Sequence, residues 1–287
     1  MTSNWYYRNE IKRITRDWVE VNCKITAREK ELLKLIYDRK LVRRDMLEVI
    51  SPSYRVLGKN RTRLINRSIK KMYLNMCLDK VHEPQEFMKG NLPATLAVDK
   101  AGSIILDKAY KPRLKKIEKK IRGEKYLFRQ LPSNYKHING VNQLEVETIL
   151  FCEENKMELT EWTLEKAIEV YYGRDRVNLI PDVLMKLEAL YEPVNAFYAY
   201  IEFDTSSENI RYKEPPIIKD KVIKYKKYKL SKIWEKDFNQ FPVVLLVTTE
   251  ERRAEFFNKI CRENGLVGLC IFYKNYKNFL ERWTKTV

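Results

Sequence analysis

Cysteine and glycine are scarce in this sequence, and each scarcity argues against a class of protein. The 287 residues include five cysteines, which are scattered and form no Cys-x-x-Cys pair. We therefore expect reduced thiols and neither a disulfide framework nor a zinc site. The eight glycines form no Gly-x-Gly-x-x-Gly or Gly-x-x-x-x-Gly-Lys-Ser/Thr motif, which disfavours nucleotide binding through a phosphate loop.

Long apolar runs are also missing. The longest aliphatic run, residues 243–247, is far shorter than the roughly 20 residues that cross a bilayer. The opening stretch, "MTSNWYYRNEIKR", lacks the apolar core of a signal peptide. These features predict a cytoplasmic protein with no membrane insertion.

Positive charge is abundant. Lysine and arginine total 56 against 39 aspartate and glutamate, a formal net charge of +17. Because 44% of the residues are apolar, the chain is expected to be globular, and it is long enough for one large or two modest domains. The surplus of positive charge makes a polyanion the leading class of partner.

The N-terminal third predicts three helices. A capping box, Thr26-x-x-Glu29, opens the first, residues 43–50 form the second, which Pro52 ends, and residues 59–76 form the third. One face of the third helix is apolar, and the other is basic. The residues of the third helix that we expect to bind DNA are Asn60, Arg61, Arg63, Arg67, Lys70 and Lys71.

The stretch "LPATLAVDKAGSIIL" follows and predicts a strand, a turn at residues 99–102 and a second apolar strand. Three helices and a strand pair are the order of a winged helix-turn-helix, whose third helix reads the major groove. An ordinary solvated basic face is the alternative, but no acid interrupts the basic residues of 59–71. Residues 1–107 are therefore predicted to be a winged helix that binds double-stranded DNA.

Residues 108–135 begin with a strongly basic stretch, "KAYKPRLKKIEKKIRGEK", which we interpret as a linker or exposed helix. This stretch could contact a phosphate backbone or could simply be solvated, and its residues do not distinguish the two. From residue 136 to 287 the pattern predicts helix–β–β–β–helix–β–helix–β. That order indicates an α/β domain with a mixed central sheet.

Three acids stand out in two predicted strands of this second domain. In "AFYAYIEFDTS", side chains alternate, so Glu202 and Asp204 share a face with Tyr198 and Tyr200, the two acids about 7 Å apart. A hairpin-length connection would place Asp182, on the preceding strand, beside them. Three converging carboxylates repel one another unless a cation such as Mg²⁺ or Mn²⁺ lies between them. The alternative is that Asp182 caps a turn after Pro181 while Glu202 and Asp204 lie at the solvated end of an edge strand.

Pro181-Asp182 followed by Glu202-x-Asp204, within this order of elements, resembles the PD-(D/E)XK restriction-endonuclease-like core. With the predicted winged helix, the chain from about residue 25 to 275 resembles the replication-relaxation family of plasmids and conjugative elements, which includes MobC-type relaxases. The resemblance implies that Asp182 and Glu202 are catalytic metal ligands. Asp204 stands where classical nucleases carry lysine and where MobC-type relaxases carry a second acid.

The missing lysine has candidate replacements on the basic helix at residues 219–232. Lys221 or Lys224 could reach a scissile phosphate, and Lys224 and Lys227 are candidate DNA-backbone contacts; solvation is the alternative for each. His137 is a candidate general base or a residue that orients the entry helix. A histidine cluster is impossible with His82 and His137 alone, which excludes relaxases of the His-hydrophobe-His class.

The basic residues favour a DNA-binding protein, and the resemblance implies that it belongs to a plasmid or mobile element. The first hypothesis is a metal-dependent nickase that acts at an origin, with single-stranded DNA at the nick as a further partner. A non-catalytic regulator is the alternative, with the nuclease-like core as scaffold or self-association surface. A replication-initiation factor that does not cut is the third.

Overall fold

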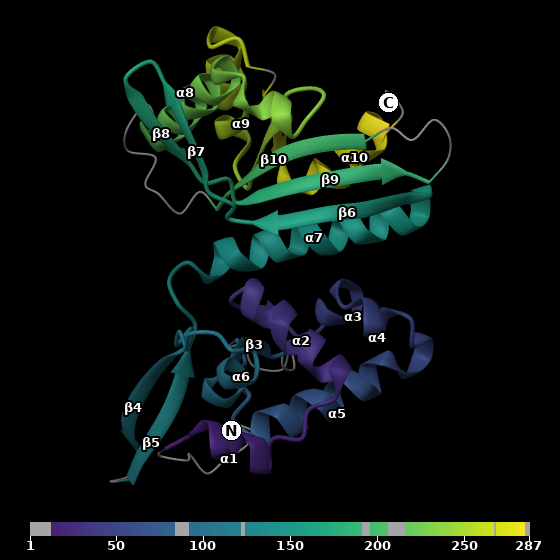
Figure 1. Cartoon of the computed structure of the whole chain (residues 1–287), viewed down its shortest axis with the longest axis vertical. Coiled ribbons are helices and arrows are strands. Elements are labelled where there is room, and N and C mark those ends of the chain that lie inside the picture. Colours follow the sequence, from purple (N-terminus) through teal and green to yellow (C-terminus); the bar gives the residue numbers. More distant parts are fainter. Residues whose placement is uncertain are drawn as a thin grey trace. The chain divides into compact units, whose positions relative to one another are not determined.

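The computed structural model divides the chain into two compact units, Met1–Asn142 and Gln143–Val287. It describes residues 13–83, 92–121, 124–190, 196–205, 216–266 and 268–284. The boundary between the units lies within one helix, α7 (Tyr135–Asn155) (Figure 1). No helix among the described residues combines the length and apolarity needed to cross a bilayer.

The first unit is mainly helical around a small sheet. Its elements in chain order are α1 (Arg16–Asn22), α2 (Ala27–Asp38), β1 (Val42–Arg43), α3 (Leu47–Ile50), α4 (Pro52–Arg55), η1 (Gly58–Asn60), α5 (Arg61–Leu74), β2 (Leu78–Val81), β3 (Thr95–Val98), α6 (Lys100–Ile105), β4 (Lys115–Ile121) and β5 (Glu124–Gln130). Strands β1 and β2 both pair antiparallel with β3, which gives the order β1-β3-β2.

Local sequence explains the helices of this unit. The predicted capping box is present, since Thr26 Oγ1 accepts from the Glu29 backbone and the Glu29 carboxylate accepts from the Thr26 backbone. The third predicted helix is α5, which buries Ile65, Ile69 and Met72 at the expected helical spacing. This apolar stripe faces the core and leaves the polar side of α5 exposed to solvent.

Three expectations for the first unit are wrong. The apolar run predicted as a second strand is the helix α6, which Asp99 caps by accepting from the Lys100 backbone. The strands that pair with β3 are β1 and β2. Residues 108–125, expected as a linker or exposed helix, lead into the antiparallel hairpin β4–β5. The second helix, α3, begins at Leu47 and not at residue 43, because Val42–Arg43 form β1; it ends at Ile50 as expected, and Pro52 opens the separate helix α4.

The second unit is built on a five-stranded mixed sheet of order β12-β11-β10-β9-β6. After α7 its elements are β6 (Met157–Leu164), β7 (Ile168–Tyr172), β8 (Asp175–Leu179), β9 (Val183–Ala189), β10 (Ala196–Asp204), α8 (Pro216–Ser231), η2 (Ile233–Lys236), β11 (Val243–Thr248), α9 (Glu251–Glu263), β12 (Gly268–Phe272), η3 (Tyr273–Asn275) and α10 (Tyr276–Thr284). The mixed sheet and the order of its main elements are confirmed.

Helices cover both faces of this sheet. On one face, Tyr200 and Leu246 pack with residues of α8 and α9 in a single apolar cluster. On the other face, Tyr276 of α10 bonds to Thr148 of α7 and contacts the sulfur of Met185 in β9. Alternating residues of β10 therefore point into two separate cores.

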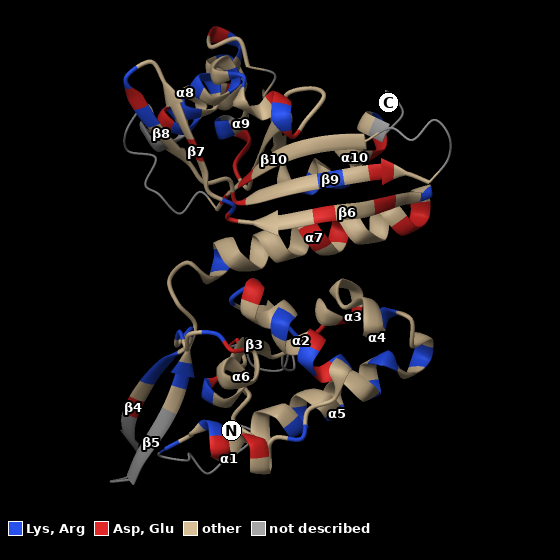
Figure 2. Cartoon of the chain, viewed as in Figure 1, with Lys and Arg blue, Asp and Glu red and all other residues tan. Residues whose placement is uncertain are grey.

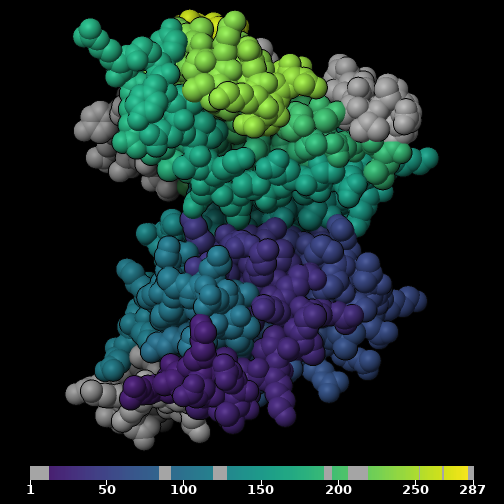
Figure 3. Space-filling view, in the orientation of Figure 1, coloured from purple at the N-terminus to yellow at the C-terminus, as the bar shows by residue number. Residues whose placement is uncertain are grey.

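The hairpin β7–β8 is an addition that the sequence pattern did not reveal. It forms a two-stranded sheet of its own and buries Val170 and Val177 in the cluster with α8. Its tip stands out from the surface of the second unit, where Tyr171 is 64% exposed (Figure 3).

Candidate functional site

The acids predicted to form a site lie at one edge of the five-stranded sheet. Strands β10, β11 and β12 are parallel, and Glu202 and Asp204 lie near the carboxyl end of β10. Strand β9 is antiparallel to β10, so Asp182, which directly precedes β9, lies at the same edge. Ligands of open α/β sheets commonly bind at this edge.

Glu202 is the most enclosed of the three acids, with 2% of its surface exposed. Lys221 Nζ lies 2.5 Å from Glu202 Oε2, and the Tyr225 hydroxyl donates to Oε1 at 2.8 Å. Burial raises the pKa of the Glu202 carboxyl, and repulsion from Asp182 raises it further. Lys221 and Tyr225 lower it, and the resulting pKa is about 7. The same acids act on the lysine: although burial lowers the pKa of Lys221, attraction to Glu202 and Asp182 leaves it raised.

Helix α8 supplies both donors because Lys221 and Tyr225 are four residues apart and share one helical face. The next turn of that face carries Tyr228, whose hydroxyl lies 3.3 Å from the Tyr200 hydroxyl. Tyr200 is 1% exposed and its pKa is raised, chiefly by burial, so it lies in the core. The alternation predicted for β10 is confirmed, since Tyr200 and Glu202 both face α8.

Asp182 and Asp204 have different partners. Asp182 Oδ2 accepts from the backbone N–H of Phe203 at 2.8 Å, which ties the start of β9 to β10. Both carboxylate oxygens of Asp204 accept from Arg253 Nη1 of α9, at 3.0 and 2.9 Å, and Thr248 also donates to Oδ2. Arg253 therefore neutralises Asp204.

The acids do not form a three-carboxylate ligand set in this arrangement. In the part of the chain that the structure describes, no group of three or more His, Cys, Asp or Glu side chains could hold a metal ion. Arg253 occupies both oxygens of Asp204, so Asp204 does not fit as a ligand here. Both oxygens of Glu202 also have donors, Lys221 and Tyr225, so a hard divalent cation would reach Asp182 and Glu202 only in place of the contact with Lys221.

The remaining predicted residues of the second unit are less enclosed. Lys224 pairs with Asp220 at 2.9 Å and Lys227 with Asp175 at 2.6 Å, and both acids are more than 60% exposed. Such exposed pairs are weak, about 0 to 1 kcal/mol each, and can exchange for phosphate contacts.

His137 is half-buried in the first turn of α7, within the first unit, whereas the acids belong to the second.

The basic face of α5 is the second candidate site (Figure 2). Arg61 and Lys71 already form ion pairs within the protein, with Glu48 and Glu29 respectively. Asn60 is exposed immediately before the helix. The exposed basic residues of α5 for which the described structure contains no ion pair or side-chain hydrogen bond are Arg63, Arg67 and Lys70.

Two partners in the sheet site were not predicted. Tyr225 could have been found from its spacing to Lys221 on the same helix. Arg253 could not, because its contact with Asp204 depends on how α9 packs beside β11.

These features define a class of protein: a mainly helical unit with exposed basic residues on one helix, followed by a mixed α/β unit with acids and a lysine at its sheet edge. The model of the replication-relaxation family matches residues 32–244, more than half of the chain, and the chain belongs to that family. Neither a curated protein nor a solved structure matches it.

Proposed function

We propose that the chain is a DNA-binding protein that acts in the replication or relaxation of a plasmid or other mobile element. The observation that carries this proposal is the exposed stripe of Arg63, Arg67 and Lys70 on α5. These residues recur at intervals of four and three, so they lie along one side of the helix. Neighbouring cations without an acid partner repel one another, and a phosphate backbone relieves that repulsion.

The order of elements in the first unit supports a winged-helix mode of binding. Helix α5 is the last helix before the pair β2–β3, which is the place of a recognition helix. Most of the connection between these strands, residues 84–91, lies outside the described residues. Double-stranded DNA is the partner that this arrangement fits, with α5 in the major groove.

Duplex binding over a salt series tests this proposal. Arg63→Ala with Arg67→Ala should weaken binding and lower the salt slope by roughly one unit for each DNA phosphate that the variant no longer neutralises. Lys30→Ala with Lys34→Ala removes the same charge from exposed positions on α2 and is the matched control. Equal reductions of affinity in the two folded variants would contradict a role for α5 beyond net charge.

A second candidate function is metal-dependent nicking of DNA at an origin. The observation in its favour is that α8 brings Lys221 to Glu202, at the sheet edge that also holds Asp182. An aspartate, a glutamate and a lysine are the functional groups of a PD-(D/E)XK site, and here the lysine would come from the following helix. A positively charged lysine whose side chain is 37% exposed at this edge is suited to bind the scissile phosphate.

Asp182 and Glu202 would hold the Mg²⁺ or Mn²⁺ ion of such a site. When bound, the ion would polarise the phosphate and stabilise the leaving oxygen. Lys221 would then exchange part of its contact with Glu202 for one with the DNA, and Tyr225 would keep Glu202 oriented.

Nicking of supercoiled plasmid that carries the native locus, with Mn²⁺ or with EDTA, tests the second function. Asp182→Asn with Glu202→Gln should abolish nicking and any stabilisation by Mn²⁺ while DNA affinity is kept or increased, because negative charge has been removed. Intact plasmid and no Mn²⁺-dependent shift of the wild-type melting temperature would leave the non-catalytic DNA-binding regulator.

A further inference from the structure

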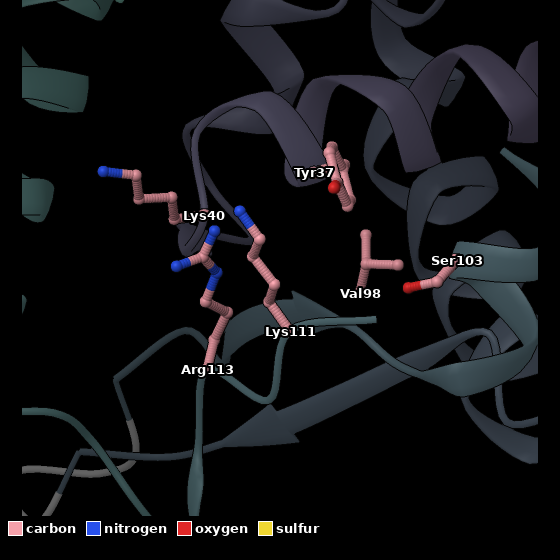
Figure 4. Close-up of a pocket in the computed structure, with 6 residues that line it drawn as sticks. All are labelled: Tyr37, Lys40, Val98, Ser103, Lys111 and Arg113. Carbon is pink, nitrogen blue, oxygen red and sulfur yellow. The ribbon is translucent and has the colours of Figure 1, made fainter. Parts of the chain in front are cut away.

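A small pocket in the first unit lies where the end of α2, the end of β3, α6 and the segment before β4 meet (Figure 4). It is separate from the exposed stripe on α5. The residues that line it are Tyr37, Lys40, Val98, Ser103, Lys111 and Arg113.

Positive charge dominates this pocket, since its lining includes three cations and no acid. Lys40 follows α2 in the left-handed backbone region, at φ 67°, which turns the chain beside the pocket. Lys111 and Arg113 are two residues apart in the segment without regular secondary structure that precedes β4. In Figure 4 both side chains rise from this segment towards the end of α2.

The segment that supplies these cations is anchored to α2. The Tyr37 hydroxyl donates to the carbonyl oxygen of Ala109 at 3.3 Å. The described structure contains no ion pair or side-chain hydrogen bond for Lys111 or Arg113. Two cations are thus held beside each other without a protein acid to neutralise them.

Ser103 provides an independent observation. Its side chain is 2% exposed, yet Oγ has no hydrogen-bond partner in the described structure. In Figure 4 this oxygen points towards Val98 and the interior of the pocket. A buried hydroxyl without a partner is destabilising, and its natural complement beside three cations is an anionic oxygen that accepts its proton.

We propose that this pocket binds a phosphate group. A guanidinium, ammonium groups and a hydroxyl are the donors that phosphate oxygens prefer, because charge-assisted hydrogen bonds are the stronger ones. The phosphate has two possible sources: a backbone phosphate of bound DNA, or a free phosphate or phosphomonoester that binds without DNA. The pocket contains no residue of α5, so an experiment can reject phosphate binding here without rejecting DNA binding by α5, and the reverse.

Inorganic phosphate is the first probe, added to the full chain at constant ionic strength against chloride. The wild-type melting temperature should rise with phosphate and saturate. Arg113→Ala should weaken the apparent affinity about tenfold, as expected for the loss of one charge-assisted hydrogen bond. Lys115→Ala, an exposed change of equal charge outside the pocket lining, is the matched control and should respond as the wild type does.

Ser103→Ala separates a binding hydroxyl from a packing one. Without phosphate it should melt at the same or a higher temperature than the wild type, because an unpaired buried hydroxyl has been removed. With phosphate its stabilisation should be smaller than that of the wild type. Two results would overturn the proposal: no stabilisation of the wild type beyond chloride, or equal phosphate affinity in the wild type and Arg113→Ala.

Duplex DNA identifies the source of the phosphate. If the pocket takes a backbone phosphate, Arg113→Ala should weaken duplex binding and lower its salt slope, whereas Lys115→Ala should do so less. If it takes a free phosphate, both variants should bind duplex alike, and only Arg113→Ala should lose the response to inorganic phosphate. Arg63→Ala with Arg67→Ala should leave the phosphate response unchanged in either case.

Discussion

Lys221 of α8 and Glu202 of β10 form an ion pair, with Nζ 2.5 Å from Oε2. The pair holds α8 over the carboxyl end of the parallel strands, where the carboxylate is fully enclosed and the lysine side chain is 37% exposed. The lysine thus remains accessible from solvent while the acid does not. A ligand that approaches this edge would meet the positive charge first.

Stability should fall with rising pH because of Glu202. Its pKa is about 7 in the folded protein against an ordinary value of 4.5, so the folded state holds the proton more tightly than the unfolded state. The protein should therefore lose about 3 kcal/mol of stability as pH rises through that interval. Urea unfolding at about pH 5 and about pH 8, at equal ionic strength, measures the difference.

Glu202→Gln should flatten this pH dependence, because its amide cannot ionise and can still accept from Tyr225. Glu158→Gln, at an exposed position on β6, is the control and should retain the wild-type slope. Parallel pH profiles for the wild type and Glu202→Gln would contradict the raised pKa.

Arg253→Ala should destabilise the protein by about 3 kcal/mol, since it leaves the carboxylate of Asp204 partly buried without its cation. Asp204→Asn should cost less, because the amide oxygen can still accept from Arg253. Thermal or urea unfolding of both variants measures this order. Greater destabilisation by Asp204→Asn would contradict the pairing.

The same Asp204→Asn variant tests the ligand role predicted from sequence. If Asp204 only pairs with Arg253, the variant should keep the Mn²⁺-dependent shift of the melting temperature that the wild type shows. Asp182→Asn is the comparison, as the acid of the candidate metal pair. Loss of the shift in both variants would restore Asp204 to the ligand set.

The sequence was most informative where one face of a strand is buried. Alternation in "AFYAYIEFDTS" correctly placed Tyr200 and Glu202 on one face, because a register error would have moved apolar side chains out of the core. The strand β11 was equally clear, as every residue from Val243 to Thr248 is buried. Such patterns reflect burial itself and need no knowledge of the neighbouring elements.

The errors arose where pairing partners are distant or patterns are ambiguous. In "KKIEKKI" the two isoleucines are four residues apart, which suits a helix, yet β4 pairs along its length with β5. In "VNLIPDVLMKL" the end of β8 and the start of β9 appeared as one strand, although Pro181 separates them. The ion pair of Asp204 with Arg253 depends on tertiary packing and has no local pattern.

Gly268→Ala should destabilise the second unit by about 1 to 3 kcal/mol through overpacking. A Cβ at this position would lie 2.4 Å from Cys261 Sγ and 2.9 Å from Cys261 Cβ, so β12 and α9 would have to separate. Adding Cys261→Ala should recover part of the stability, because it removes the sulfur. A double-mutant cycle measures this coupling, and strictly additive effects would contradict the close packing of α9 on β12.

Lys221→Met should separate the structural role of the lysine from a catalytic one. Methionine keeps much of the aliphatic stem but removes the charge, so Glu202 loses its cation, its pKa should rise further, and stability near pH 8 should fall by a few kcal/mol. At about pH 5, where Glu202 is protonated in the folded protein, the destabilisation should be smaller.

If Lys221 also binds the scissile phosphate, Lys221→Met should nick plasmid at least tenfold more slowly under conditions where it is fully folded, with duplex affinity nearly unchanged. Lys224→Met removes a charge one helical turn away, from an exposed pair with Asp220, and should alter neither stability nor nicking by comparable amounts. A folded Lys221→Met protein that nicks as fast as Lys224→Met would show that the ion pair only supports the sheet edge.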